Sequence, residues 1–230
     1  LIWDGDILYQ STRLDAYQES LTRLFAQGQT YNCNCTRSEV KAMGSIYDGS
    51  CRDKNISLIE PFAVRIRTSS NIIGFDDQIQ GYHQQRVEQE VGDFVILRKD
   101  KFFAYQLAVV IDDEYQQVTN VIRGCDLLDS TFRQIHLQTV LGLETPVYGH
   151  IPVITNSSGK KLSKQHFADP IDTKNDKTLI FKALKFLGQN PPNGLEDATN
   201  TEQLQWAIYN WDIQAIPKLA NINEKSKRIV

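Results

Sequence analysis

Residues 151–165 read IPVITNSSGKKLSKQ, and this stretch indicates where a strand ends and a polar loop begins. The apolar residues 151–154 predict a short strand, and the turn-forming residues 156–159 predict its end. The loop that follows carries four polar side chains: Lys160, Lys161, Ser163 and Lys164. Such groups can neutralise the charge that develops when a polyphosphate bond breaks, although a solvated lysine cluster is the plainer alternative.

Two segments upstream add to this interpretation. The nearly continuous apolar run from Ala104 to Ile111 predicts a strand that is buried on both faces of a parallel sheet. Arg123 follows a second apolar pair and precedes a glycine, where a parallel strand would end. Ligands of open α/β sheets bind at that edge, and a guanidinium there can fork onto a carboxylate. The competing interpretation is a structural ion pair of Arg123 with Asp112 or Asp113.

The segment from Phe102 to Lys164 resembles class I aminoacyl-tRNA synthetases of the glutamate and glutamine branch. Their signature loop reads KMSKS, and residues 161–165 read KLSKQ. The resemblance implies ATP, with magnesium, as a substrate bound by Lys161, Ser163 and Lys164, of which Lys164 is the catalytic residue. It also implies that Tyr105 and Arg123 bind glutamate. Cys125 departs from the small or acidic residue of the relatives.

Composition describes an ordinary globular protein, with 41% hydrophobic and 23% charged residues. No apolar run approaches the roughly 20 residues that span a membrane, and no signal-peptide pattern is present. The net charge is −3, so the overall field does not attract nucleic acid. Residues 160–230, however, carry 11 Lys and Arg against 8 Asp and Glu. Any site for a polyanion must therefore be local.

Three cysteines lie close together in the sequence: Cys33, Cys35 and Cys51. Three thiolates suit a tetrahedral zinc ion, which needs a fourth ligand. No histidine lies between them, so the residues alone leave Tyr47, Asp48, Asp53 or water as candidates. Unpaired buried thiols are the alternative, whereas a disulfide is disfavoured in a chain with no export signal.

The spacing of Cys33, Cys35, Tyr47 and Cys51 resembles the zinc site of the glutamyl-queuosine tRNA(Asp) synthetases within that branch, where a tyrosine oxygen is the fourth ligand. The resemblance implies one structural zinc, which holds a small knuckle against the tRNA acceptor end. Four arginines of the following β-like region are candidate phosphate contacts, although solvated arginines on a sheet face are the plainer account: Arg65, Arg67, Arg86 and Arg98.

Hydrophobic periodicity predicts the remaining elements. A helix is expected from Leu14 to Phe25, with Gly28 at its C-terminal cap, and strands are expected around residues 62–67 and 94–98. Residues Asp129 to Thr131 offer N-caps for a helix that ends at Gly142. Two more helical patterns lie at 179–187 and 204–211.

Together these features predict an α/β protein with an incomplete class I nucleotide-binding, Rossmann-like fold. The expected parts are residues 1–30 and 99–168 for the two halves of that fold, 31–98 for an inserted zinc-containing α+β subdomain, and 169–230 for a C-terminal helical appendage. The chain begins at Leu1 without methionine and lacks the family's first phosphate-binding motif. It is therefore expected to be a fragment, inactive on its own if half of the nucleotide pocket is absent.

The resemblance implies a cytoplasmic, monomeric enzyme that activates L-glutamate with ATP and transfers it to the queuosine of tRNA(Asp). The short segment after the signature loop favours this function over that of a full glutamyl-tRNA synthetase, which carries an anticodon-reading domain there. Two alternatives are a truncated glutamyl-tRNA synthetase that charges tRNA(Glu) and a non-catalytic, zinc-containing tRNA-binding module.

Overall fold

The computed structural model describes residues 3–44, 46–54, 56, 61–163 and 178–224. The chain divides into two compact units. The first unit comprises residues 1–75, 83–119 and 129–146, and the second comprises residues 76–82, 120–128 and 147–230. None of the helices in the described ranges combines the length and the apolar character needed to cross a bilayer.

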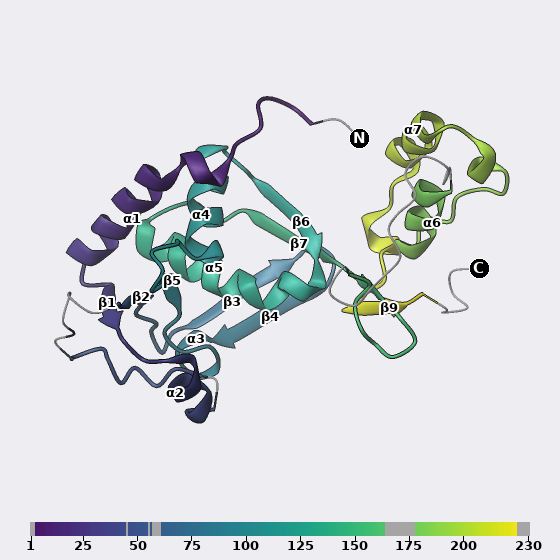
Figure 1. Cartoon of the computed structure of the whole chain (residues 1–230). Helices are drawn as coiled ribbons and strands as arrows, with labels where there is room; N and C mark the ends of the chain where they lie inside the picture. The colour runs from purple at the N-terminus through teal and green to yellow at the C-terminus, as the bar shows by residue number, and fades with distance from the viewer. Residues whose placement is uncertain (1–2, 45, 55, 57–60, 164–177, 225–230) are drawn as a thin grey trace. The chain divides into compact units, whose positions relative to one another are not determined.

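A three-stranded antiparallel sheet lies at the centre of the first unit, with the strand order β1-β2-β5 (Figure 1). Its strands are β1 Thr30–Cys33, β2 Ala63–Ile66 and β5 Val95–Leu97. The strands expected from the alternating pattern are confirmed. The solvent-exposed face that was expected for the arginines is not found on β2, because all four residues of this strand are buried. Arg65 lies opposite Tyr31 of β1 in the ladder.

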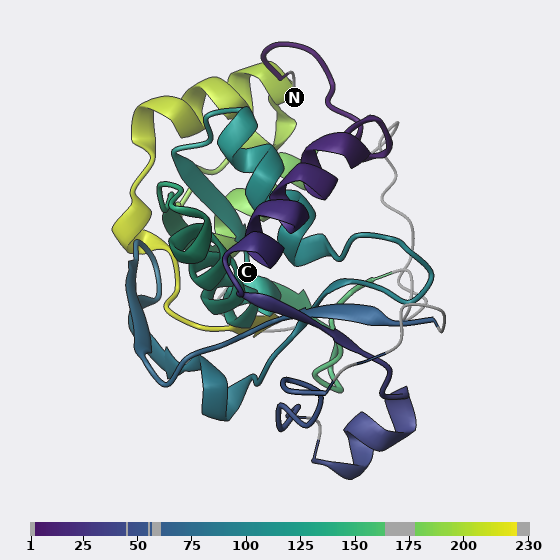
Figure 2. The ribbon, with the colours of Figure 1, turned by 90° about the vertical axis from the view of Figure 1, so that its left-hand side faces the viewer.

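Three helices complete the core of the first unit: α1 Leu14–Ala26, α4 Tyr105–Tyr115 and α5 Leu128–Leu141. Apolar side chains from these helices form one cluster with those of β2 and β5. Figure 2 shows α1 crossing the sheet beside α4. In α1 the buried residues Tyr17, Leu21 and Leu24 recur at helical spacing. Gly28 follows the helix with a positive φ of 67°, so the predicted helix and its cap are confirmed.

The strand predicted between Ala104 and Ile111 was wrong, because residues 105–115 form the helix α4. Periodicity alone does not distinguish a short apolar run in a strand from one in a buried helix. The buried positions Leu107, Ala108, Val110 and Asp112 follow the helical period. The side chain of Gln106 bonds to Ser130 and Gln134 of α5 and so joins the two helices.

The helix predicted to end at Gly142 is confirmed as α5, but its expected N-cap is not. The 3₁₀ turn η2 Cys125–Leu127 runs directly into Leu128, so Asp129 lies in the first helical turn. The short elements of the first unit are η1 Gln10–Thr12, α2 Arg37–Ala42 and α3 Val87–Glu90. The paired strands β3 Ile72–Asp77 and β4 Gly81–Arg86 belong partly to each unit.

The second unit contains two parallel strand pairs. β6 Asn120–Gly124 pairs with β7 Val147–Ile151, and β8 Val153–Thr155 pairs with β9 Asn221–Asn223. The single strand expected at 151–154 is therefore divided at Pro152, which has no N–H to donate to a ladder. The prediction that Arg123 ends a parallel strand is confirmed.

Helices occupy the C-terminal part of the second unit, as the sequence predicted. They are α6 Leu179–Phe186, α7 Asn200–Asn210 and the 3₁₀ turns η4 Leu195–Asp197 and η5 Ile213–Ala215. A capping box formed by Thr199 and Glu202 begins α7. Phe181 and Leu184 of α6 and Ile216 are buried in this part.

Candidate active site and metal centre

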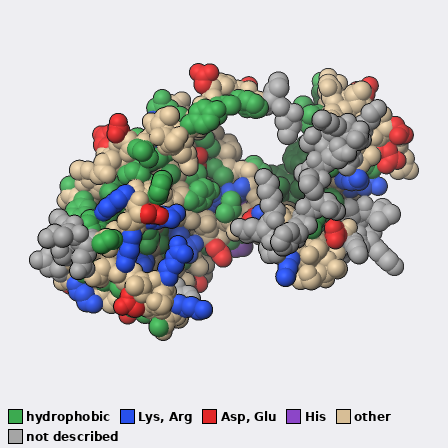
Figure 3. Space-filling view, viewed as in Figure 1, with side chains coloured by type: hydrophobic (Ala, Val, Ile, Leu, Met, Phe, Trp, Pro, Cys, Tyr) green, Lys and Arg blue, Asp and Glu red, His purple; other side chains and the backbone are tan. Residues whose placement is uncertain are grey.

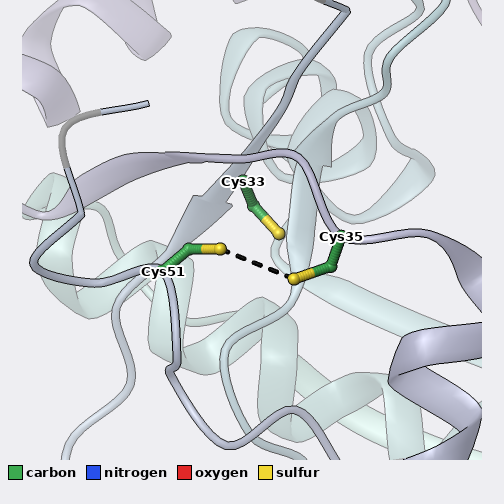
Figure 4. A group of neighbouring side chains, drawn as sticks. All are labelled: Cys33, Cys35 and Cys51. Carbon is green, nitrogen blue, oxygen red and sulfur yellow. Dashed lines mark hydrogen bonds between the residues drawn. The ribbon is translucent and has the colours of Figure 1, made fainter. Parts of the chain in front are cut away.

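The three cysteines lie together in the first unit. Cys33 ends β1, Cys35 lies just before α2, and Cys51 lies in the turn that follows Tyr47. Their sulfur atoms all lie within 4.8 Å of one another, and Figure 4 shows the side chains converging from two segments of the chain. Within the described residues, no other group of His, Cys, Asp and Glu side chains meets this criterion for a metal site. The sequence prediction of a cysteine cluster is confirmed.

The distances in this cluster fit a tetrahedral metal centre. With metal–sulfur bonds of about 2.3 Å and a metal–oxygen bond of about 2.0 Å, the edges of a tetrahedron are about 3.8 Å between two sulfurs and about 3.5 Å between sulfur and oxygen. The Sγ atoms of Cys35 and Cys51 are 3.5 Å apart. The Tyr47 hydroxyl lies 3.5 Å from Cys33 Sγ and 3.6 Å from Cys35 Sγ. The Tyr47 hydroxyl therefore lies at the distance from two of the sulfurs that a fourth ligand would have.

The Tyr47 oxygen also accepts two further hydrogen bonds. The backbone N–H of Cys51 donates to it at 3.0 Å, and the Ser50 hydroxyl donates at 3.3 Å. Burial and the interaction with the Cys51 side chain raise the pKa of the phenol. A metal ion would therefore have to displace the phenolic proton, as it does when it binds thiols.

Arg65 supports the cluster from β2. Its Nε donates to Cys33 Sγ at 3.2 Å, its Nη1 donates to the Asp93 carbonyl at 2.6 Å, and its guanidinium lies 3.8 Å from the centre of the Tyr47 ring. Burial opposes ionisation of Cys33, but the hydrogen bond with Tyr47 and the one from Arg65 outweigh it and lower the pKa of this thiol. Arg65 is thus a buried cation beside the cysteine cluster, and its expected role as a solvated arginine was wrong.

A second buried cluster holds the loop that carries Cys51. The carboxylate of Asp93 accepts hydrogen bonds from Arg52 at 2.6 and 2.7 Å, from the Tyr31 hydroxyl at 2.5 Å and from Thr68. Burial opposes ionisation, yet the bond from Arg52 and the other donors hold the pKa of Asp93 below its usual range. Gly92, beside it, forms a β-bridge with Tyr47.

A cationic cavity of about 700 Å³ adjoins the cysteines in the first unit. Figure 3 shows Lys and Arg side chains gathered over this part of the unit. The charged residues of the lining are Arg37, Arg65, Arg98, Lys99 and Asp100. Asp100 pairs with Arg98, and Lys99 donates to the Asn34 carbonyl. The cavity has the positive charge that phosphate groups require.

The strand-end arginine lies in the second unit, at the carboxyl end of β6. Arg123 Nε donates to His150 Nε2 at 3.0 Å, and its guanidinium lies 5.2 Å from the centre of the Tyr148 ring. Asp112, one suggested alternative partner, accepts hydrogen bonds from Gln10, Arg13 and Tyr17. Burial raises the pKa of the neighbouring Cys125 thiol to about 11, so this thiol is neutral at physiological pH.

The lysine hairpin lies in the same unit as Arg123. Lys161 bridges to Thr155 of β8, and its Nζ lies 2.5 Å from Asp126 Oδ2, three residues beyond Arg123. Both side chains of this ion pair are more than one-third exposed. Ser163 is described, whereas Lys164, the expected catalytic residue, lies outside the described residues. Tyr105 belongs to the first unit, where it begins α4 with 48% of its surface exposed.

Several residues around these sites were not singled out as functional from the sequence. Arg65 was considered only as a phosphate contact or a solvated arginine, and Arg52 was not considered. His150 and Asp77 are 73 positions apart, and their pairing depends on the fold. The sequence signal that could have indicated His150 is a histidine inside an otherwise apolar strand pattern, since such a side chain needs hydrogen-bond partners when buried.

Comparisons with known proteins show that this chain is similar to tRNA synthetases. Residues 1–220 match the family model for the catalytic domain of class I tRNA synthetases (E and Q). The chain is similar to the Glutamyl-Q tRNA(Asp) synthetase of Pseudomonas fluorescens, with 43% identity over 96% of this chain and 74% of the relative. It is also similar to that of Aromatoleum aromaticum, with 45% identity over 94% of this chain and 70% of the relative.

Solved structures share the fold. The crystal structure of a glutamate tRNA ligase from Elizabethkingia meningosepticum in complex with its amino acid superposes with a TM-score of 0.71 and 20% identity. It covers 98% of this chain, and the chain spans about half (53%) of that protein. Glutamate-tRNA synthetase from Elizabethkingia anophelis gives the same TM-score with 21% identity, over 96% of this chain and 52% of that one.

Proposed function

Because the chain belongs to the catalytic-domain family of the class I tRNA synthetases for E and Q, we propose that it activates L-glutamate with ATP and transfers the glutamyl group to the queuosine base of tRNA(Asp). The observation that carries this proposal is the 43% and 45% identity to two Glutamyl-Q tRNA(Asp) synthetases along almost the whole chain. The strand-end guanidinium and the lysine hairpin within one unit support it independently.

The proposed reaction has two steps. In the first, a carboxylate oxygen of glutamate attacks the α-phosphorus of ATP, the bond to the β,γ-diphosphate breaks, and glutamyl adenylate and pyrophosphate form. In the second, a hydroxyl of the queuosine cyclopentene diol attacks the glutamyl carbonyl, loses its proton and releases AMP. In such transfers the protein contributes mainly positioning and charge stabilisation.

Arg123 is the residue proposed to hold a glutamate carboxylate. A guanidinium offers several N–H donors in a planar fork that matches a carboxylate. Its place at the carboxyl end of β6 is where ligands of parallel sheets bind. Tyr105, the partly exposed first residue of α4, is proposed as the second glutamate contact on the basis of the family resemblance.

The lysine hairpin is proposed to bind ATP through Lys161, Ser163 and Lys164, with Lys164 as the catalytic residue and magnesium accompanying the nucleotide. In the ATP-free chain, Lys161 pairs with Asp126. A surface ion pair of this kind stabilises a protein by only about 0–1 kcal/mol. Lys161 can therefore exchange the carboxylate for a phosphate at little cost.

One zinc ion is proposed to be held by Cys33, Cys35, Tyr47 and Cys51, with a structural role in an inserted subdomain. The tetrahedral fit of the sulfur and oxygen atoms supports this ligand set. The cationic cavity beside it is proposed to contact the tRNA. Elemental analysis of the purified chain should find about one zinc per chain, whereas a metal-free, folded protein would contradict the metal assignment.

The substrate assignment is tested with radiolabelled glutamate and three RNAs: tRNA(Asp) with queuosine, the same tRNA without queuosine, and tRNA(Glu). Transfer only to the first is expected. Charging of tRNA(Glu) alone would identify a truncated glutamyl-tRNA synthetase instead. RNA binding without glutamate-dependent release of pyrophosphate from ATP would identify a binding module.

The phosphate site is tested by the Lys164→Ala substitution, with Lys160→Ala as a matched control from the same hairpin. Loss of one donor to the transition state should slow glutamate activation by roughly 10²-fold. The control should remain near the wild-type rate. Equal rates for the two variants would show that Lys164 does not act on the transferring phosphate.

A further inference from the structure

We propose that His150 is a positioning residue that fixes the guanidinium of Arg123 for the substrate carboxylate, and that Asp77 holds the imidazole in the tautomer this requires. The inference rests on the proposed glutamate-binding role of Arg123. The positioning role gives a function to the buried pair of His150 and Asp77. The proposed reaction does not otherwise depend on this pair.

His150 is built into the strand pair that presents Arg123. The parallel register places Arg123 of β6 opposite His150 of β7. The His150 side chain is fully buried (0% exposed), and its Nε2 lies 3.0 Å from Arg123 Nε. Its ring stacks on the Tyr148 ring at an interplanar angle of 15°. The imidazole therefore has a fixed place beside the guanidinium.

Hydrogen-bond chemistry determines the tautomer. An arginine only donates, so Nε2 of His150 must carry a lone pair and no proton. The proton of the neutral imidazole then lies on Nδ1, which is 2.5 Å from Asp77 Oδ2. The imidazole thus accepts from the arginine on one side and donates to the aspartate on the other.

Asp77 is itself held as a carboxylate. Its Oδ1 accepts hydrogen bonds from the backbone N–H groups of Ile79, Gln80 and His150, at 2.9, 2.8 and 3.1 Å. Burial opposes ionisation, but the backbone donors and His150 lower the pKa of Asp77. An anionic Asp77 can only accept, which leaves Nδ1–H of His150 as the donor in this pair.

These contacts fix the plane of the Arg123 guanidinium. His150 engages Nε, and Nη2 lies 3.4 Å from the Leu127 carbonyl oxygen. An arginine side chain carries about 2 kcal/mol of rotamer entropy. Fixing the guanidinium before the substrate arrives removes part of this cost from binding.

Two substitutions of His150 separate positioning from simple core packing. The amide of glutamine reaches the place of the histidine Nε2, so His150→Gln keeps an acceptor for Arg123. The amide of asparagine reaches the place of Nδ1, so His150→Asn keeps a donor for Asp77 and loses the acceptor. The matched control is His136→Asn, since His136 is also buried but bonds to the Arg67 carbonyl.

Calorimetric titration of the whole chain with L-glutamate, together with thermal unfolding, provides the first readout. His150→Asn should weaken glutamate binding by roughly 10-fold or more, and His150→Gln should retain more of the affinity. His136→Asn should lower the melting temperature without weakening binding. Equal glutamate affinities for both His150 variants would overturn the positioning role. A loss of glutamate affinity that parallels the fall in melting temperature across all three variants would also overturn it.

Long-range ¹H–¹⁵N NMR of the His150 imidazole provides a readout that needs no substrate. A proton on Nδ1 and none on Nε2 is expected in the wild-type chain, and a proton on Nε2 would overturn the inference. The two proposals fail in different ways. If the wild-type chain does not bind glutamate, the proposed function falls. If it binds glutamate but His150 shows the other tautomer, only the positioning role falls.

Discussion

Buried charged side chains explain most of the local structure around the cysteine cluster. Arg65 and Asp93 are both buried and make several hydrogen bonds within a few ångströms of the proposed zinc ligands. Three thiolates and a phenolate around a divalent ion would carry a net negative charge. A guanidinium in contact with one thiol and one phenol ring offsets this charge where water cannot.

Replacing Arg65 with methionine should therefore weaken zinc binding by about 10–100-fold, the usual effect of losing a residue that supports a metal ligand. Methionine keeps much of the side-chain volume, so the sheet should remain folded. Competition with a chromophoric chelator measures the affinity. Arg98→Met is the matched control, because Arg98 lines the same cavity but pairs with Asp100 at the surface. An equal effect of the two substitutions would contradict the role of Arg65.

Asp93 should make the chain sensitive to acid. Its folded-state pKa lies below the unfolded value of about 3.9. Its stabilising effect is therefore fully present above pH 4 or so, and is lost as the pH falls through the folded-state pKa. Asp93→Asn should cost on the order of 3 kcal/mol at neutral pH and flatten the acid slope. Urea unfolding at several pH values measures both, and an unchanged slope would show that Asp93 is not the titrating group.

Sequence reasoning found the side chains proposed as zinc ligands, but it did not find the residues that contact them. Cys33, Cys35 and Cys51 stand out because thiols close in sequence are uncommon, whereas Tyr47 was singled out only by the resemblance to the family's zinc site. Arg65 does not stand out, because the alternating pattern of β2 assigns it to the solvent side. Its burial depends on the knuckle around Tyr47 folding back over that face, a long-range contact that no local pattern contains.

At the scale of elements, Gly92 allows the segment around Tyr47 to lie against the chain just before β5. Gly92 has a positive φ of 70°, and a Cβ there would lie 2.5 Å from the Tyr47 carbonyl oxygen. Gly81 has a similar φ of 85°, but a Cβ there would meet nothing within 4 Å. Substitutions at these two glycines therefore distinguish the effect of backbone strain from that of steric contact with Tyr47.

Gly92→Ala should weaken zinc binding and lower the free energy of unfolding more than Gly81→Ala. Both substitutions incur the left-handed penalty of about 1–2 kcal/mol, but only the first forces Tyr47 away from the cysteines. Thermal unfolding and metal titration of the two variants provide the comparison. Equal losses in both variants would mean that the contact with Tyr47 does not position it.

The helix α4 shows where element prediction from sequence reaches its limit. Residues 104–111 are apolar at almost every position, so they fit a strand buried on both faces as well as a buried helix. Packing determines that this segment is a helix, because α4 shares its core with α1, α5 and the sheet. By contrast α1, α5 and α7 carry spaced apolar positions, and a helix is confirmed at each, although the expected N-cap of α5 was wrong and α7 begins four residues earlier than expected.

At the scale of the whole molecule, the two units should respond differently to metal removal. All four proposed zinc ligands belong to the first unit, and the strands β6 to β9 belong to the second. Treatment with a strong chelator should increase hydrogen exchange in β1, α2 and the Cys51 turn. The backbone amides of α6 and α7 serve as the internal control and should exchange as before. A uniform increase would indicate that metal loss unfolds the chain globally.

The pairing of β8 with β9 has a consequence for synthesis. Val153 leaves the ribosome long before Asn221, the residue it aligns with in the sheet. Until then β8 is a nascent edge with unpaired N–H and C=O groups, open to a neighbouring polypeptide or to a chaperone. A stop codon shortly before Asn221 would make this state permanent, and such a product should aggregate even though α6 and α7 are fully translated.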